Sequence, residues 1–100
     1  MNAFKEVVTK ARVWGRESKR WSSASKGMVP RVFYGFESIG GRDTIVTGGL
    51  VKIQDLQARF PNTVESPNTL YLVSSSLPAY APLMAEIAKR SGARIVLNQN

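Results

Sequence analysis

Strand-like and helix-like segments alternate along residues 31–100, and this alternation constrains the fold more than any other feature of the sequence. Three short apolar stretches are rich in β-branched and aromatic residues, which is typical of buried strands. Apolar residues at helical spacing lie between these stretches. The expected strands are 31–36, 70–74 and 94–98, and the expected helices follow Gly48 and Gly49 as far as Pro61 and run from Pro82 to Gly92.

Strands that are joined by helices of about a dozen residues favour a parallel sheet with right-handed crossovers. We therefore expect an α/β fold, specifically a partial Rossmann-like β-α-β-α-β sheet preceded by a basic N-terminal arm. A parallel sheet needs cover on both faces, and two helices leave one face poorly covered unless the arm supplies a third. The last strand ends where a loop and a helix are expected to follow, so we expect a longer parent protein.

Basic residues are concentrated near the N-terminus. The chain has 14 Lys and Arg against 7 Asp and Glu, for a net charge of +7. Residues 1–30 carry seven basic and two acidic side chains, whereas residues 31–100 carry seven and five. We therefore divide the chain into a basic amphipathic arm with a linker, residues 1–28, and an incomplete Rossmann-like domain, residues 29–100.

The arm has an apolar stripe at helical spacing, formed by Phe4, Val7, Val8, Ala11 and Trp14. Gly15 interrupts this pattern, and residues 21–27 have the composition of a linker. One interpretation is peripheral contact of residues 4–21 with an anionic membrane surface. The other is a short helix, docked or frayed, with a solvated basic face.

The composition excludes several classes of site. There is no Cys and no His, which removes disulfides, Cys or His zinc sites, thiol nucleophiles and Ser-His-Asp constellations. We expect no metal and no bound cofactor. No apolar run approaches the roughly 20 residues of a membrane span, and the N-terminus lacks a signal-peptide core. We therefore expect a cytoplasmic protein, with peripheral membrane contact as the alternative.

The candidate site lies where the expected strands end, because open parallel sheets bind ligands at their carboxyl edge. Gly48 and Gly49 precede a helix, so their backbone can approach an anionic or sugar ligand closely, although two glycines before a helix more often form just a tight turn. The Ser74 and Ser75 hydroxyls suit a hydroxylated ligand or a turn. The amides of Asn98 and Asn100 suit sugar hydroxyls because they both donate and accept.

No catalytic residue stands out. Glu37 and Asp43 are the carboxylates nearest the expected site, and neither has a partner at a spacing suited to general acid–base catalysis. The chain has neither a G-x-G-x-x-G motif after the first strand nor a P-loop motif, which disfavours dinucleotide and P-loop folds.

Three segments together resemble the N-terminal domain of GT-B fold glycosyltransferases of the family 4 type (group 1). They are the glycine-rich turn and helix of residues 47–62, residues 70–76 and residues 94–100. The resemblance covers residues 31–100 and leaves the arm outside. It implies two Rossmann-like domains facing a cleft, of which the N-terminal one mainly recognises the acceptor.

The resemblance implies a hexosyltransferase-type parent that moves a sugar from a nucleotide-sugar to a glycan or lipid-linked acceptor, as in polysaccharide biosynthesis. Gly48 and Gly49 match the turn that lines the cleft beside the donor phosphates. The donor-binding domain, with its Glu-x₇-Glu motif, is not within residues 1–100, so these residues alone are expected to be inactive. The lack of His fits a retaining reaction that relies on electrostatic stabilisation of the leaving diphosphate.

Two other functions stay open. The chain is alternatively a stand-alone α/β interaction domain that docks through an uncovered sheet face. It is alternatively a basic nucleic-acid-binding module, since its net charge is +7 and it has two Trp. Nucleic acid is the less favoured partner, because residues 31–100 have little excess charge and no recognition motif.

Overall fold

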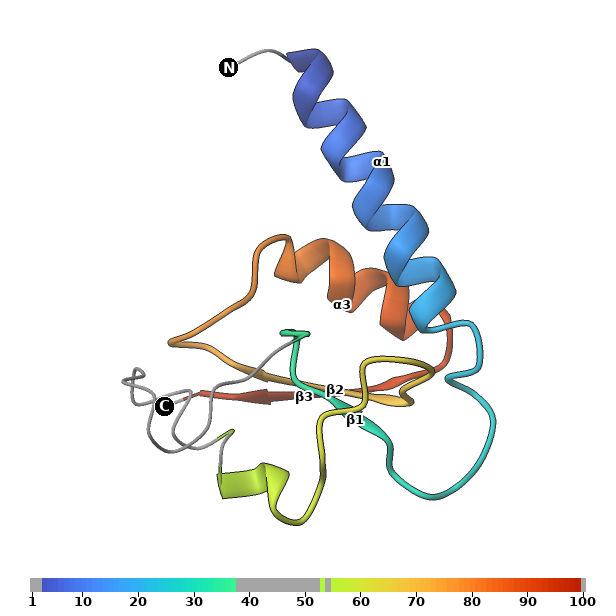
Figure 1. The fold of residues 1–100 in the computed structure, drawn as a ribbon, viewed down its shortest axis with the longest axis vertical. Helices are drawn as coiled ribbons and strands as arrows, with labels where there is room; N and C mark the ends of the chain where they lie inside the picture. Colours follow the sequence, from blue (N-terminus) through green and yellow to red (C-terminus); the bar gives the residue numbers. More distant parts are fainter. Residues whose placement is uncertain (1–2, 38–52, 54, 100) are drawn as a thin grey trace.

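The chain folds as an α/β structure around a parallel three-stranded sheet (Figure 1). The computed structural model describes residues 3–37, 53 and 55–99. The elements are helix α1 (Ala3–Arg20), strand β1 (Val32–Phe33), strand β2 (Thr69–Val73), helix α3 (Ala81–Arg90) and strand β3 (Arg94–Asn98). Residues 53 and 55–57 are also helical, and they fall within the helix expected after Gly49.

The sheet has the order β1-β2-β3, with both pairs parallel, as the alternation of the sequence predicts. Leu70 at its centre pairs with Phe33 on one side and Ile95 on the other. The β2–β3 pairing runs over five residues, from Thr69 beside Arg94 to Val73 beside Asn98.

Strand β1 is shorter than the predicted strand 31–36. Beyond Phe33, the side chain of Asn62 takes the place of the hydrogen bonds between strands. The Tyr34 N–H donates to Asn62 Oδ1 at 3.2 Å, and Asn62 Nδ2 donates to the carbonyl of Phe36 at 2.8 Å. Gly35 lies between them with φ +91°, which is outside the strand region. The backbone groups of Tyr34 and Phe36 therefore have hydrogen-bond partners although the strand does not continue.

Helices α1 and α3 lie on the same face of the sheet (Figure 1). The core on this face joins residues of the sheet to residues of both helical regions: Trp21, Ala24, Phe33, Leu70, Leu72, Met84, Ile87 and Ala88. The Trp21 and Phe33 rings meet edge to face, with centroids 6.2 Å apart. Trp21 and Ala24 belong to the segment that the sequence predicts as a linker, and both are buried.

Helix α1 continues through Gly15, where the sequence predicts an interruption. A single Gly costs only about 1 kcal/mol in a helix interior. The burial of Val13, Glu17 and Arg20 on one side of the helix supplies a tertiary anchor on both sides of Gly15.

A buried ionic network fixes the C-terminal end of α1. The Glu17 side chain is fully buried and accepts hydrogen bonds from Arg20 Nη1 at 2.6 Å and from Trp21 Nε1 at 3.0 Å. Arg20 also donates to the Val64 carbonyl and to Glu37, each at 3.0 Å. Every donor and acceptor in this network has a partner, which is the condition for burying charge at low cost.

The guanidinium of Arg20 also stacks on an aromatic ring. Its Cζ lies 4.1 Å from the centroid of Phe33. A guanidinium over a ring face gains a cation–π attraction when both are shielded from water. Arg20 thus links helix α1 directly to strand β1.

Helix α3 begins and ends where its sequence predicts. Pro82 occupies its first turn, and Ser91 is the C-cap. Gly92 follows with φ +91°, and its N–H donates to the Lys89 carbonyl at 3.1 Å. The Ala93 N–H donates to the Ala88 carbonyl at 3.0 Å, which completes a Schellman ending that favours Gly at the left-handed position.

The second face of the sheet has a smaller core, in which Ile53 and the partly buried Leu56 pack against the sheet. Ile53 is fully buried against Val32, Tyr34 and Val73. The Tyr34 hydroxyl donates to the Phe60 carbonyl at 2.6 Å, and its ring meets Tyr71 edge to face. Burial, and to a lesser extent the neighbouring Tyr71, raises the pKa of the Tyr34 phenol above its ordinary value of 10.0.

No helix in the described parts of the chain is both long and apolar enough to cross a membrane.

We expect Glu17→Gln to destabilise the fold by about 3 kcal/mol, because it leaves the buried Arg20 guanidinium without its nearest compensating charge. Glu6→Gln is the matched control, since Glu6 forms an exposed i,i+4 pair with Lys10 and its loss costs under about 0.5 kcal/mol. Urea unfolding followed by circular dichroism measures both. Equal destabilisation by the two variants contradicts the role assigned to Glu17.

We expect alkaline pH to destabilise the chain in part through Tyr34. The raised pKa means that the folded chain keeps the phenol proton to higher pH than the unfolded chain does. The stability from this group is therefore complete below the ordinary pKa and is lost as pH rises through the folded pKa. Tyr34→Phe should lose about 1 kcal/mol at neutral pH, with its hydrogen bond, and show a shallower decline above about pH 10. An unchanged alkaline slope in urea titrations of Tyr34→Phe, with Tyr80→Phe as control, contradicts this assignment.

Candidate functional site

The carboxyl ends of β2 and β3 meet at one edge of the sheet and are joined by their polar residues. The Ser74 N–H donates to the Asn98 carbonyl at 3.0 Å, one step beyond the last paired residues. The side chain of Asn98 donates through Nδ2 to the Tyr71 hydroxyl at 3.0 Å. The sheet thus brings Ser74 and Asn98 together from positions 24 residues apart in the sequence.

The predicted site residues differ in their exposure to solvent, and three of them are not described by the structure. Ser74 and Ser75 are both exposed at this edge, and Asn98 is half-buried. Gly48, Gly49 and Asn100 lie outside the described residues. The part of the site that the structure describes therefore consists of two hydroxyls and an amide whose orientation is fixed by Tyr71.

The two loops that leave β1 and β2 touch each other closely at this edge. A Cβ built on Gly35 would lie 2.7 Å from Cγ of Pro78, closer than real Cβ contacts. Pro78 is buried, and Tyr80, just before α3, adopts a left-handed φ of 59°. The sequence did not predict this contact. The local features that accompany it are a glycine among aromatic residues and a proline three residues before a helix.

Glu37, one of the two carboxylates expected near the site, has a structural partner. It accepts a hydrogen bond from the buried Arg20. Asp43 lies outside the described residues. Within residues 3–37, 53 and 55–99, no group of three or more His, Cys, Asp or Glu is arranged to hold a metal ion.

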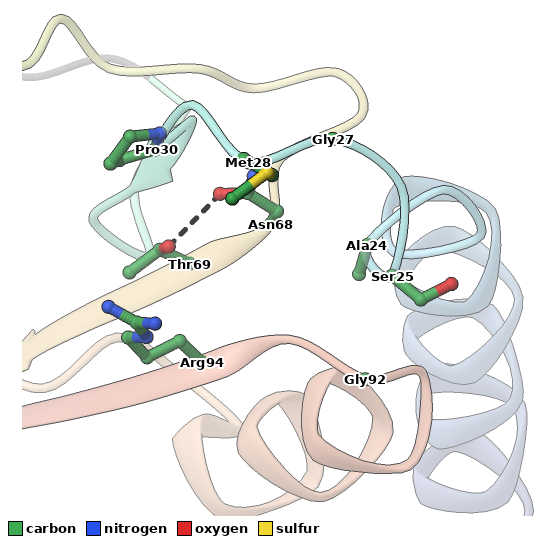
Figure 2. A pocket seen from close by; sticks show the side chains of 9 residues that line it. All are labelled: Ala24, Ser25, Gly27, Met28, Pro30, Asn68, Thr69, Gly92 and Arg94. Atoms are coloured by element: carbon green, nitrogen blue, oxygen red, sulfur yellow. Dashed lines mark hydrogen bonds between the residues drawn. The ribbon is translucent and has the colours of Figure 1, made fainter.

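A pocket of about 320 Å³ lies at the opposite, amino edge of the sheet (Figure 2). Residues from the α1–β1 connection and from the starts of β2 and β3 line it: Ala24, Ser25, Gly27, Met28, Pro30, Asn68, Thr69, Gly92 and Arg94. Asn68 occupies its centre, yet its side chain is engaged within the chain. Its Oδ1 accepts from the Arg31 N–H at 2.7 Å, and its Nδ2 donates to the Val29 carbonyl at 2.9 Å.

Arg31 holds the same region from the other side. Its guanidinium donates to the carbonyls of Ser23, Lys26 and Ser66 at 2.8–3.2 Å. The polar groups at the amino edge thus fasten the α1–β1 connection to the sheet. These bonds within the chain explain the pocket as a structural feature. The carboxyl edge stays the candidate site because open parallel sheets bind ligands there.

Comparisons of the chain with protein-family models, with curated proteins and with solved structures found no match. The case for a function therefore rests on the chain's own residues and their arrangement.

We expect Gly35→Ala to destabilise the fold by about 1–3 kcal/mol, because it adds a methyl group against Pro78 at a left-handed φ. Gly15→Ala is the matched control in helix α1, where an added Cβ meets nothing within 4 Å. It should stabilise the chain by up to about 1 kcal/mol. Thermal unfolding of both variants checks that the two changes in stability have opposite signs. A loss of stability in both contradicts the role assigned to the Gly35–Pro78 contact.

Proposed function

We propose that residues 29–100 are the acceptor-side portion of a GT-B glycosyltransferase and form an incomplete Rossmann-like domain preceded by the basic arm. The observation that carries the proposal is the adjacency of β2 and β3, whose carboxyl ends are joined through Ser74 and Asn98. Two of the three segments with the family resemblance thereby contribute polar groups to one sheet edge. Ligands of open parallel sheets bind at such an edge.

In the proposed reaction, the bond between the anomeric carbon of the sugar and the diphosphate oxygen breaks. A bond from the same carbon to an acceptor hydroxyl oxygen forms, the hydroxyl proton is released, and the nucleoside diphosphate leaves. The donor belongs to a second domain. By the family resemblance, the backbone N–H groups of Gly48 and Gly49, which lie outside the described residues, would approach the donor phosphates.

The residues of the carboxyl edge would bind and orient the acceptor. The hydroxyls of Ser74 and Ser75 and the amide of Asn98 are exposed or half-buried and suit the hydroxyls of a glycan. The hydrogen bond from Asn98 to Tyr71 fixes the direction of the amide before an acceptor arrives. A preoriented group loses less freedom on binding, which is the contribution that an acceptor domain makes to catalysis.

The first test is the coding sequence after Asn100. The proposal expects the reading frame to continue into a second α/β domain that contains Glu-x₇-Glu. A stop codon directly after Asn100, or continuation into an unrelated sequence, overturns the proposal and makes a stand-alone interaction domain the leading function.

The second test is activity of the full-length product, measured as release of nucleoside diphosphate from a panel of nucleotide-sugars and glycan acceptors. Ser75→Ala should lower kcat/KM about tenfold, the value of one lost hydrogen bond. Ser25→Ala is the matched control, because Ser25 is also exposed but lies at the amino edge. Absence of diphosphate release across the panel, or equal effects of the two variants, contradicts the proposal.

A further inference from the structure

Helix α1 presents an apolar stripe on the side that faces away from the body of the protein. Phe4, Val7 and Trp14 are 70%, 65% and 46% exposed. The side chains that bind α1 to the body, Val13 and Glu17, project from a different side of the same helix. In Figure 1 the N-terminal half of α1 extends beyond α3 and the sheet. The stripe is therefore largely exposed at Phe4 and Val7 and about half exposed at Trp14, while the helix stays anchored.

Basic side chains flank this stripe along one border. Helical geometry of 3.6 residues per turn brings Lys5, Arg12, Arg16 and Lys19 to adjacent positions on that border. All four are exposed. On the other border, Lys10 pairs with Glu6 at 3.3 Å, so its charge is compensated within the helix.

The acidic residues of α1 offset only part of the charge of this border. Glu6 is engaged with Lys10, and the buried Glu17 is shared between Arg20 and Arg16, so it partly compensates Arg16. The outer surface of α1 therefore combines an apolar stripe with a one-sided excess of positive charge.

We propose that helix α1 is a membrane-surface anchor that lies along an anionic lipid bilayer. The stripe enters the boundary between headgroups and acyl chains, Trp14 sits at headgroup level, and the basic border contacts lipid phosphates. The helix need not detach from the body, because its docked side is separate from the stripe. This inference is independent of the glycosyltransferase proposal.

Charge and polarity together favour a lipid surface over other anionic partners. A nucleic acid would neutralise the basic border but would leave Phe4, Val7 and Trp14 exposed to water. Their apolar surface would then contribute nothing to binding. A bilayer with anionic headgroups satisfies both features at once. The described residues contain no helix that could cross the bilayer, so the interaction would be along its surface.

The experiment is co-sedimentation of the full chain with large unilamellar vesicles. Vesicles of phosphatidylcholine alone are compared with vesicles that contain about one third phosphatidylglycerol. The proposal expects binding only to the anionic vesicles and weakening of this binding by salt. Brominated acyl chains should quench Trp14 and spare Trp21, which is fully buried in the core. A Trp14→Phe variant identifies which Trp is quenched.

Paired variants separate the two components of the surface. Lys5→Gln with Arg12→Gln should lower the partition coefficient about 25-fold, at about fivefold for each charge. Lys26→Gln with Lys89→Gln removes the same charge elsewhere and should change it less than about twofold. Val7→Ser should weaken binding roughly fivefold, whereas Met28→Ser, at a 97% exposed loop residue, should not.

Helix content and Trp21 emission are measured in each variant, so that a loss of fold is recognised. If Val7→Ser loses helix content, the charge variants and Trp14 quenching still decide the question. Failure to bind anionic vesicles overturns the proposal, as does equal weakening by the two charge pairs. Binding to nucleic acid duplexes without binding to vesicles also overturns it, and assigns the basic border to nucleic acid.

Discussion

The buried carboxylate of Glu17 is the interaction on which the rest of the structure depends. It neutralises Arg20 and accepts the indole N–H of Trp21. The same Arg20 reaches the Val64 carbonyl, Glu37 and the ring of Phe33. One ionic cluster thus joins helix α1 to the β1 strand and to the segment before β2. Without a partner for each charge, the cost of desolvation would oppose docking of the helix.

Two asparagine side chains bind the backbone on either side of the short strand β1. Asn68 fastens the α1–β1 connection at the amino edge, through the backbone of Val29 and Arg31. Asn62 binds the segment that follows β1, through hydrogen bonds to the backbone of Tyr34 and Phe36. An asparagine amide both donates and accepts, so one side chain can satisfy two backbone groups that a short strand leaves without partners.

Because of these hydrogen bonds, the amino edge, the carboxyl edge and the outer side of α1 differ in which polar and apolar groups they expose. The amino edge is occupied by bonds within the chain, whereas the carboxyl edge presents Ser74, Ser75 and Asn98. The outer side of α1 carries an apolar stripe with a basic border. The proposed roles in acceptor binding and membrane contact would therefore use separate surfaces, and a membrane-anchored helix would leave the carboxyl edge accessible to a lipid-linked acceptor.

The sequence by itself determined the elements whose signals are local. The limits of α3 followed from Pro82 and Gly92, and the positions of β2 and β3 from short apolar runs. Of the candidate site, it predicted the edge that joins Ser74 to Asn98, because parallel strands end together, but it missed the contact of Gly35 with Pro78. Only the tertiary structure decided that α1 continues past Gly15, that Trp21 is core, and that β1 ends at Phe33. Each of those outcomes depends on a partner far along the chain, such as Asn62 for Tyr34 or Phe33 for Trp21, and periodicity within one segment carries no information about such partners.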